Sequence, residues 1–146
     1  MPEEKIPAIM REFVKTMGDG DVEKSLAYFT EDAIWVNPGG TFRGKDEIRR
    51  YTACLYDQMK GIKVKECGNG IIAQGNKAFF EHEISGTMEG KKATMLAICA
   101  YEFEGDKIKE TRTTYDRLSM AQQAVKGWFP KMMVNMIVKQ AEKGLR

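Results

Sequence analysis

The stretch AFFEHEIS, residues 78–85, alternates between two kinds of side chain, and this alternation decides the fold class. The first set is Ala78, Phe80, His82 and Ile84, and the second is Phe79, Glu81, Glu83 and Ser85. A period of two is typical of a β-strand that turns one face to the core. Because the first set is mostly apolar, we expect His82 to point toward the core.

The same period continues through the second half of the chain. Strands are predicted at Ile62–Cys67, Ile71–Ser85, Lys92–Phe103 and Lys107–Asp116. Glycine-containing turns such as Gly68-Asn69-Gly70 join these strands. Because the connections are short, consecutive strands are expected to be antiparallel.

The first third of the chain has a helical period instead. Apolar residues recur at steps of three and four, at Ile6, Ile9, Met10, Phe13, Val14 and Met17. This spacing predicts an amphipathic helix. Asp21 is suited to cap a second, short helix, a short strand is predicted at Ala33–Val36, and a third helix from about Lys45 to Lys60.

Two further helices are predicted near the end of the chain, over Gln122–Trp128 and Pro130–Lys143. Helices followed by antiparallel strands indicate an α+β domain with one curved sheet and helices on its concave side. We expect residues 1–146 to form a single domain with a C-terminal helical extension at about 118–144.

Composition excludes several classes of protein. Lys and Arg number 23 and Asp and Glu 21, so the net charge is +2 and no nucleic-acid partner is expected. The longest apolar run, Met95–Tyr101, is too short to span a membrane, and no secretory signal is expected. Cys54, Cys67 and Cys99 form no C-x-x-C pattern, which favours a reducing cytoplasm. With a single histidine, no metal site is expected.

The strand predicted at Lys92–Phe103 is apolar on both faces. Met95, Ala97, Cys99 and Tyr101 alternate with Leu96, Ile98 and Ala100. A strand of this kind in an antiparallel sheet needs a cover on each side. Helices would cover one side, so a homodimer is expected through Leu96, Ile98 and Ala100; an adaptor that binds another protein through this face stays open.

Two motifs have simple structural interpretations. Gly39–Lys45 matches the pattern G-x-x-x-x-G-K between a strand and a helix, but Asp46 stands where a phosphate-binding loop needs Ser or Thr. We interpret it as a turn into a helix. The Met-rich tail around Met132 and Met136 is interpreted as ordinary core or dimer surface, and a lid over a hydrophobic ligand is the alternative.

The last strand carries charged residues. Glu110 and Arg112 are two residues apart, about 7 Å along a strand, so they can pair with each other. Asp116 is about 13 Å from Arg112 by the same rise and is therefore not its obvious partner. Asp116 stays available for chemistry, or it caps the helix that follows.

Several stretches carry a resemblance to a known family. They are FVKTMGDGD at 13–21, AYFTEDAIW at 27–35, FRGKDEI at 42–48, SGT at 85–87 and TYDRLSMAQQ at 114–123. Together they resemble the SnoaL-like polyketide cyclases of the nuclear transport factor 2-like and ketosteroid isomerase-like superfamily. The resemblance covers about residues 6–125 and implies a cone: a strongly bent sheet around the first and third helices, with a pocket open at one end.

The resemblance also implies roles for particular residues. In SnoaL-like cyclases the aspartate of the last motif, here Asp116, points into the pocket as acid and base. By parity, Ile108, Glu110, Arg112 and Thr114 would face inward with it, and Asn37 would face inward from the first strand, with Trp35 and Ala33. The three functional groups of the steroid isomerases fall at Phe13, Asn37 and Cys99, so their usual mechanism is not expected here.

The expected function is therefore a cofactor-independent cyclase or isomerase that abstracts a proton next to a carbonyl group of a cyclic or aromatic substrate. Asp116 is the expected base, His82, Asn37 and Arg112 are the expected donors to the enolate, and no cofactor is expected. The expected apolar wall comprises Phe13, Met17, Trp35, Tyr51, Leu55 and Cys99. The alternatives are a non-catalytic domain that binds a small hydrophobic or aromatic ligand and, ranked lower, an epoxide hydrolase that uses Glu110, Arg112 and Asp116.

Overall fold

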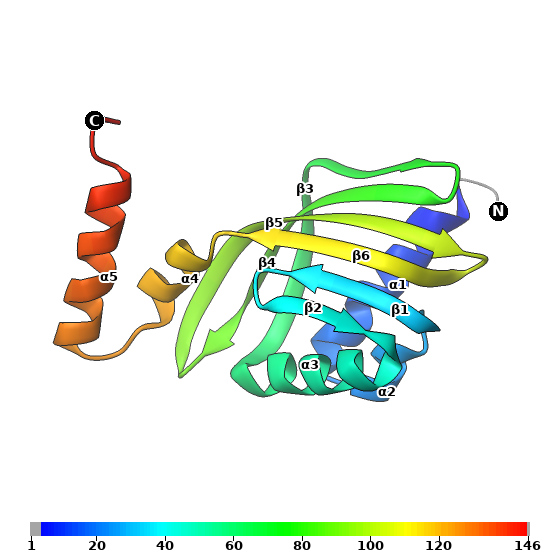
Figure 1. Ribbon diagram of the computed structural model, residues 1–146, viewed down its shortest axis with the longest axis horizontal. Helices are drawn as coiled ribbons and strands as arrows, with labels where there is room; N and C mark the ends of the chain where they lie inside the picture. The colour runs from blue at the N-terminus through cyan, green and yellow to red at the C-terminus, as the bar shows by residue number, and fades with distance from the viewer. Residues whose placement is uncertain (1–3, 146) are drawn as a thin grey trace.

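A computed structural model describes residues 4–145 of the chain (Figure 1). In chain order its elements are α1 (Lys5–Asp19), α2 (Val22–Leu26), β1 (Phe29–Asn37), β2 (Gly40–Arg43), α3 (Gly44–Gln58), β3 (Met59–Gln74), β4 (Lys77–Met88), β5 (Lys91–Glu104), β6 (Lys107–Tyr115), α4 (Arg117–Ala124) and α5 (Trp128–Ala141). The predicted α+β class is confirmed, with helices before the main run of strands.

The six strands form one sheet in the order β2-β1-β6-β5-β4-β3. Neighbours that are consecutive in the chain are antiparallel, as expected from their short connections. β1 lies parallel to β6. An early strand and the last strand of the chain are therefore neighbours in the interior of the sheet. The sheet bends around the N-terminal helices, with α1 against β3 and α3 against β1 (Figure 1).

The apolar stripe of α1 packs as its spacing predicts. Ile6, Met10, Phe13 and Met17 are buried, and Ile9 is partly buried. The helix ends at Gly20, whose left-handed φ of 67° closes the last turn without the penalty a side chain would bring. Asp21 then accepts a hydrogen bond from the Lys24 amide at 3.0 Å, which confirms it as the cap of α2.

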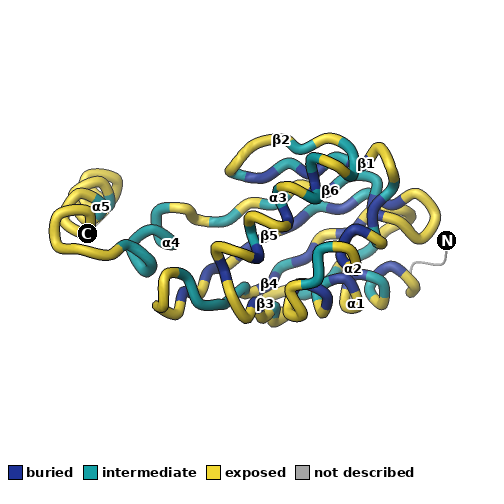
Figure 2. The backbone as a smooth tube through the Cα atoms, turned by 90° about the horizontal axis from the view of Figure 1, so that it is seen from below, coloured by how far each residue is buried: buried dark blue, intermediate teal, exposed yellow. Residues whose placement is uncertain are grey.

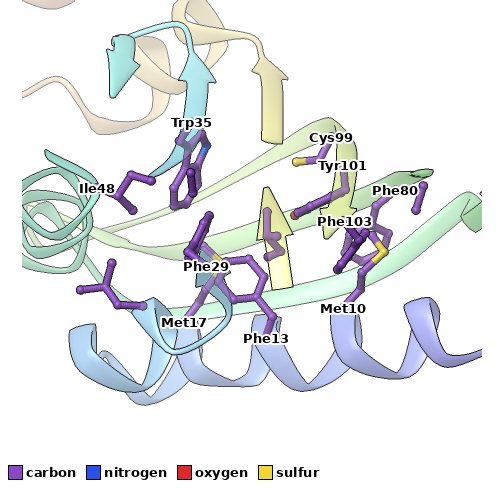
Figure 3. Packing of buried hydrophobic residues seen from close by; sticks show 14 of the residues in the cluster. Met10, Phe13, Met17, Phe29, Trp35, Ile48, Phe80, Cys99, Tyr101 and Phe103 are labelled. Carbon is purple, nitrogen blue, oxygen red and sulfur yellow. The ribbon is translucent and has the colours of Figure 1, made fainter. Parts of the chain in front are cut away.

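A chain of aromatic rings connects α1 to α3 through the first strand. Phe29 lies between Phe13 and Trp35, with ring centroids 5.5 and 5.6 Å away (Figure 3). Trp35 meets the edge of Tyr51 at 5.0 Å, and Tyr51 stacks on Phe42 at 4.5 Å. Such pairs each contribute about 0.5–1.5 kcal/mol beyond burial, so these rings fix the walls of the interior.

The segment Gly68-Asn69-Gly70 is not a turn between two strands, as predicted, but a bulge inside β3. The register passes from Glu66 opposite His82 to Ile71 opposite Phe80, so β3 has three more residues than β4 there. The carboxylate of Glu81 accepts hydrogen bonds from the Asn69 backbone and side-chain nitrogens at 2.9 and 3.2 Å. These bonds give the Asn69 nitrogens in the bulge their hydrogen-bond acceptor, and the strand continues beyond the bulge to Gln74.

A second bulge, at Lys109, corrects the parity expected for the last strand. Glu102 lies opposite Glu110 and Phe103 opposite Ile108, so Lys109 is an extra residue in β6. An extra residue reverses which side chains face inward along the rest of a strand. Ile108 is therefore buried as expected, but beyond the bulge the inward residues are Thr111, Thr113 and Tyr115.

Of the two C-terminal helices, only α5 lies apart from the cone. α4 packs against β5, whereas α5 contacts α4 and stands beyond the end of the sheet (Figure 1). No residue of α5 is buried, and in Figure 2 most of its backbone has the colour of exposed residues. Within residues 4–145 no helix has the length and apolar content needed to cross a membrane.

Candidate functional site

A partly enclosed cavity of about 100 Å³ lies between α1, α3 and the inner face of the sheet. Its wall is mostly apolar and aromatic. Five methionines contribute to it: Met17, Met59, Met88, Met95 and Met120. Since methionine side chains are unbranched and flexible, this wall can adjust to shapes that branched side chains would reject.

The structure places the whole expected apolar wall at this cavity. Phe13, Met17, Trp35, Tyr51, Leu55 and Cys99 all line it, and they come from α1, β1, α3 and β5. Figure 3 shows Trp35, Cys99 and Tyr101 on the sheet side of the core, with Phe13 and Met17 on α1 opposite them. That these residues bind a substrate stays a prediction.

Asp116 does not face the cavity, and the expectation that it lies in an apolar pocket is wrong. Its side chain is exposed, and Oδ1 accepts hydrogen bonds from the amides of Leu118 and Ser119 at 2.9 and 3.0 Å. Asp116 is thus the N-cap of α4, the second of the two roles its position allowed. The physical reason is the bulge at Lys109, which turns the even-numbered residues that follow it to the outside.

Glu110 and Arg112 follow the same parity and also lie outside the cavity. Arg112 Nη2 and Glu110 Oε1 are 2.5 Å apart, so these two charges do neutralise each other as their spacing predicts. The Arg112 side chain is 67% exposed. Neither residue can touch a molecule in the cavity, so the expected roles of Arg112 as an enolate donor and of Glu110 in substrate contact lose their geometric basis.

Asn37 is buried, as its parity with Trp35 predicts, but it does not line the cavity. Its Oδ1 accepts a hydrogen bond from the Gly39 amide at 2.8 Å, which holds the turn between β1 and β2. Its Nδ2 has no hydrogen-bond partner among the described residues. The amide therefore serves the hairpin, and its donor role toward a ligand stays a prediction.

His82 lies at the cavity, on the inner face of β4, as predicted. Its ring stacks on Phe80 at 4.2 Å, and Nδ1 is 3.3 Å from the Phe80 carbonyl oxygen. Burial lowers the pKa of the imidazole, so the ring is neutral near pH 7. With Nδ1–H donating to the carbonyl, Nε2 carries a lone pair, and within residues 4–145 no hydrogen bond engages it.

Thr113 also lines the cavity, although its residue type and position did not mark it as a site residue in the sequence. Its Oγ1 accepts a hydrogen bond from the indole nitrogen of Trp35 at 3.1 Å and from the thiol of Cys99 at 3.3 Å. A hydroxyl group has two acceptor lone pairs and one proton to donate. Both lone pairs are used here, so the Thr113 proton is left to donate, and the residue lines the cavity. Its signal in the sequence was the face shared by Thr111, Thr113 and Tyr115.

Three tyrosines add phenol groups to the wall: Tyr51, Tyr101 and Tyr115. Burial is the main cause that raises the pKa of Tyr51 and of Tyr101, so both phenols keep their protons and stay neutral. Burial likewise raises the pKa of the Cys99 thiol, which argues against a thiolate nucleophile.

The cavity wall carries no formal charge. Among residues 4–145, those that line it include no Asp, Glu, Lys or Arg, and the one histidine is neutral. In the same part of the chain, no three His, Cys, Asp or Glu side chains gather in a way that could hold a metal ion. The site can therefore desolvate a neutral molecule and offer it hydrogen bonds, but it has no counter-ion for a charged one.

Comparison with solved structures places this architecture among known folds. A protein from Catenulispora acidiphila with a ketosteroid isomerase-like fold, in complex with trimethylamine, is similar with a TM-score of 0.73 and 16% identity over 80% of this chain and 91% of that one. An LEH-like epoxide hydrolase from M. tuberculosis gives a TM-score of 0.72 and 16% identity over 94% of this chain and 98% of that one. TerC, co-crystallised with polyporic acid, gives 0.70 and 19% over 80% and 95%. At these identities the likeness shows the fold alone.

No curated protein matches the chain. The sequence model of the SnoaL-like domain family, in contrast, matches residues 10–111, which run from α1 to the inward-facing Thr111 of β6. The matched segment contains most of the cavity wall, and the cone around it has the predicted architecture. The chain belongs to the SnoaL-like domain family.

Proposed function

We propose that this protein binds a small, uncharged, mostly apolar organic molecule that carries one hydrogen-bond acceptor, such as a carbonyl oxygen. The observation that carries the proposal is the wall itself, which is apolar, free of formal charge, and supplied with hydroxyl donors. A charged ligand would lose its hydration without gaining an ion pair, and it would therefore be rejected.

Thr113 supports the preference for an acceptor oxygen. Trp35 and Cys99 use both lone pairs of its hydroxyl, so a ligand at this point meets a proton rather than a lone pair. A site with a committed donor discriminates against analogues that lack the acceptor, because the donor would then stay buried and unpaired.

The size of the cavity supports a small ligand. An engineered apolar cavity of about 150 Å³ can hold a benzene molecule, so a cavity of about 100 Å³ holds a six-membered ring only if side chains move. Movement of the methionine side chains would extend this limit. One similar structure is a complex with trimethylamine and another was co-crystallised with polyporic acid, which supports small-molecule binding on this fold.

Calorimetric titration with matched probes tests the proposal. We expect cyclopentanone or cyclohexanone to bind, and cyclohexane, cyclohexanecarboxylate and cyclohexylammonium to bind at least about tenfold more weakly. Ala97 lines the cavity between the strands of His82 and Tyr115, so Ala97→Leu fills it and should abolish binding. Tight binding of a charged probe, or unchanged binding to Ala97→Leu, would refute the proposal.

A second candidate is acid-base catalysis on such a ligand, with His82 in place of Asp116. The observation that favours it is the neutral imidazole with Nε2 unpaired beside an otherwise uncharged wall. Nε2 would take a proton from the carbon next to the carbonyl, Thr113 would donate a hydrogen bond to the enolate oxygen, and the imidazolium would return the proton to another carbon. The ligand would leave as an isomer, without a cofactor.

Exchange of ligand protons with deuterium separates the two candidates. A catalytic site should speed the exchange of α-protons of bound cyclohexanone in D₂O, and His82→Gln should remove this effect while binding persists. A pure binding site leaves the exchange rate at that of the buffer. Equal acceleration by the wild type and His82→Gln would exclude His82 as the base.

A further inference from the structure

The inner face of β5 has a recess of small residues inside the cavity. Ala97 and Cys99 face inward there, and the larger Met95 and Tyr101 precede and follow them on the same face. Figure 3 shows the short Cys99 side chain next to the much larger Tyr101 ring. All four residues line the cavity, so a small ring can rest on the sheet between Met95 and Tyr101.

His82 and Thr113 lie on the two sides of this recess. His82 is opposite Ala97 on β4, and Thr113 is opposite Cys99 on β6. Because neighbouring strands are about 4.8 Å apart, the backbones of β4 and β6 are separated by about 10 Å across β5. Both side chains line the cavity, so a ring that rests on Ala97 and Cys99 lies between the imidazole and the hydroxyl group.

The imidazole of His82 offers an acceptor. Its ring is neutral because burial lowers its pKa, and Nδ1 is 3.3 Å from the Phe80 carbonyl oxygen. That oxygen can only accept, so Nδ1 carries the proton and Nε2 the lone pair. Within residues 4–145 the buried side-chain atoms that are sealed off and unpartnered are Asn37 Nδ2, Thr52 Oγ1 and Thr111 Oγ1. Nε2 is not one of them, so it opens onto the cavity.

Neighbouring side chains leave Nε2 of His82 without a donor. Tyr115 lies opposite Ala97 on β6, but among the described residues its hydroxyl makes no hydrogen bond to the imidazole. Glu66 lies opposite His82 on β3, and its two carboxylate oxygens accept from Arg11 at 2.6 and 3.2 Å. An acceptor that is buried without a partner costs free energy, which a donor on a ligand would restore.

Thr113 offers the opposite kind of group. The Trp35 indole and the Cys99 thiol donate to its Oγ1 at 3.1 and 3.3 Å, so the hydroxyl keeps its own proton to donate. The recess therefore has an acceptor on its β4 side and a donor on its β6 side. A ligand with a single acceptor oxygen satisfies Thr113 alone, whereas a ligand that also has a donor at its other end satisfies His82 as well.

We propose that the ligand is a small cyclic hydroxyketone, whose carbonyl oxygen accepts from Thr113 and whose hydroxyl group donates to Nε2 of His82. This inference rests on the proposed binding of an uncharged molecule with an acceptor oxygen, and it adds the second polar group. An amine in place of the hydroxyl would be charged and would lose its hydration at an uncharged wall. A lactam has an uncharged donor, but its N–H is next to the carbonyl group and cannot reach the other side of the recess.

Calorimetric titration with three five-membered rings tests the inference. The probes are cyclopentanone, 3-hydroxycyclopentanone and 3-methylcyclopentanone, and the last two differ mainly in the donor because hydroxyl and methyl groups are similar in size. We expect the hydroxyl probe to bind at least about tenfold more tightly than the methyl probe. Equal or tighter binding of the methyl probe overturns this inference alone. Absence of binding by all three ketones overturns the proposed function together with it.

Two variants identify the partner of the hydroxyl group. His82→Phe keeps an aromatic ring beside Phe80 and removes Nε2, so it should lose the preference for the hydroxyl probe and still bind the methyl probe. Gln58→Leu is the matched control, because it removes the amide oxygen of the wall and should keep the preference. A preference that survives His82→Phe, or that disappears in Gln58→Leu, contradicts the assignment. Circular dichroism confirms the folding of each variant.

The chain has a single histidine, which allows a direct measurement on the unmodified protein. With ¹⁵N-labelled histidine, nuclear magnetic resonance of the untagged chain at pH 7 should show a protonated Nδ1 and an unprotonated Nε2. Because a hydrogen bond to the lone pair shifts the ¹⁵N signal upfield, 3-hydroxycyclopentanone should move the Nε2 signal much further than 3-methylcyclopentanone. A proton on Nε2 in the free protein, or equal shifts with the two probes, overturns the inference even if His82→Phe does not fold.

Discussion

The hydroxyl group of Thr113 serves two donors at once, so its removal affects both. Thr113→Val keeps the shape of the side chain but leaves the buried indole N–H of Trp35 and the thiol of Cys99 without their acceptor. An unpaired buried donor costs about 1–3 kcal/mol, and we expect that loss in the free energy of unfolding. Thr113→Ser keeps the hydroxyl and should lose about 0.8 kcal/mol for one methyl group. Urea denaturation measures both, and equal losses would contradict the role of the hydroxyl.

His82 gives the protein a particular dependence on pH. Burial lowers its pKa in the folded state, so below the unfolded value of about 6.5 the unfolded chain binds a proton that the folded protein does not. The stability that His82 confers is therefore complete above about pH 6.5 and is lost as pH falls below it. Denaturant unfolding between pH 7 and 5 should show a smaller decline in His82→Gln than in the wild type. Parallel curves for the two proteins would mean that folding does not lower the pKa of His82.

Carboxyl groups with lowered pKa values do not affect the comparison of the wild type with His82→Gln. Hydrogen bonds to Lys24, Arg49, Lys109 and Arg11 lower the pKa values of Asp21, Glu23, Asp32 and Glu66 respectively. These groups lose their stabilising effect at lower pH, as they protonate around pH 4 and below. They also remain in His82→Gln, so their effect cancels in the difference between the two proteins.

At the scale of elements, Gly68 in the bulge of β3 and Gly75 in the turn after β3 give a matched pair of glycine substitutions. Gly68 and Gly75 have φ values of 53° and 60°, which cost a residue with a side chain about 1–2 kcal/mol. A Cβ on Gly75 meets no atom within 4 Å, whereas a Cβ on Gly68 would lie 2.2 Å from the Glu81 carboxylate. Gly68→Ala should therefore destabilise the protein by about 1–2 kcal/mol more than Gly75→Ala in thermal unfolding, because Glu81 must leave Asn69. Equal losses would show that the bulge does not need Glu81.

The Gln123 side chain makes two of the hydrogen bonds that attach α4 to β5. β6 ends opposite Ala97, so β6 does not pair with β5 at Thr94. There the Gln123 side chain makes hydrogen bonds to the Thr94 backbone instead. Two hydrogen bonds of about 1 kcal/mol each protect the Thr94 amide, so Gln123→Ala should speed its hydrogen exchange by about 30-fold. Gln122→Ala, which removes only the 3.4 Å bond to Asn135, is the control and should leave Thr94 unchanged. Equal exchange in both variants would place the support of α4 elsewhere.

The pairing of the strands explains which side-chain orientations could be predicted from the sequence. The alternation of side chains correctly predicted the inward faces of β4 and β5. These two strands pair without a bulge from Ala78, which lies opposite Tyr101, onward. The resemblance placed Asp116 on the wrong face, and parity carried the error to Glu110 and Arg112, because Lys109 adds one residue and neither composition nor spacing marks that addition. The apolar wall was predictable from residue type and face, whereas the hydrogen bonds of Thr113 depend on contacts between distant strands.

At the scale of the whole molecule, the cone and the C-terminal helices differ in what they bury. The cone holds the buried apolar cluster and surrounds an uncharged cavity. α4 contributes Met120 to the cavity wall, so the C-terminal region touches the site through one helix. α5 contributes no buried residue, which separates it from the packing that stabilises the cone.

The parallel pairing of β1 with β6 has a consequence for synthesis of the protein. Trp35 and its acceptor Thr113 are 78 residues apart in the chain. The ribosome must therefore release more than three-quarters of the polypeptide before β1 and β6 can pair. Until then β1 exposes an edge of unpaired backbone hydrogen-bonding groups. The nascent chain depends on its last strand to seal that edge, which makes the interval before β6 emerges the time when a chaperone would matter most.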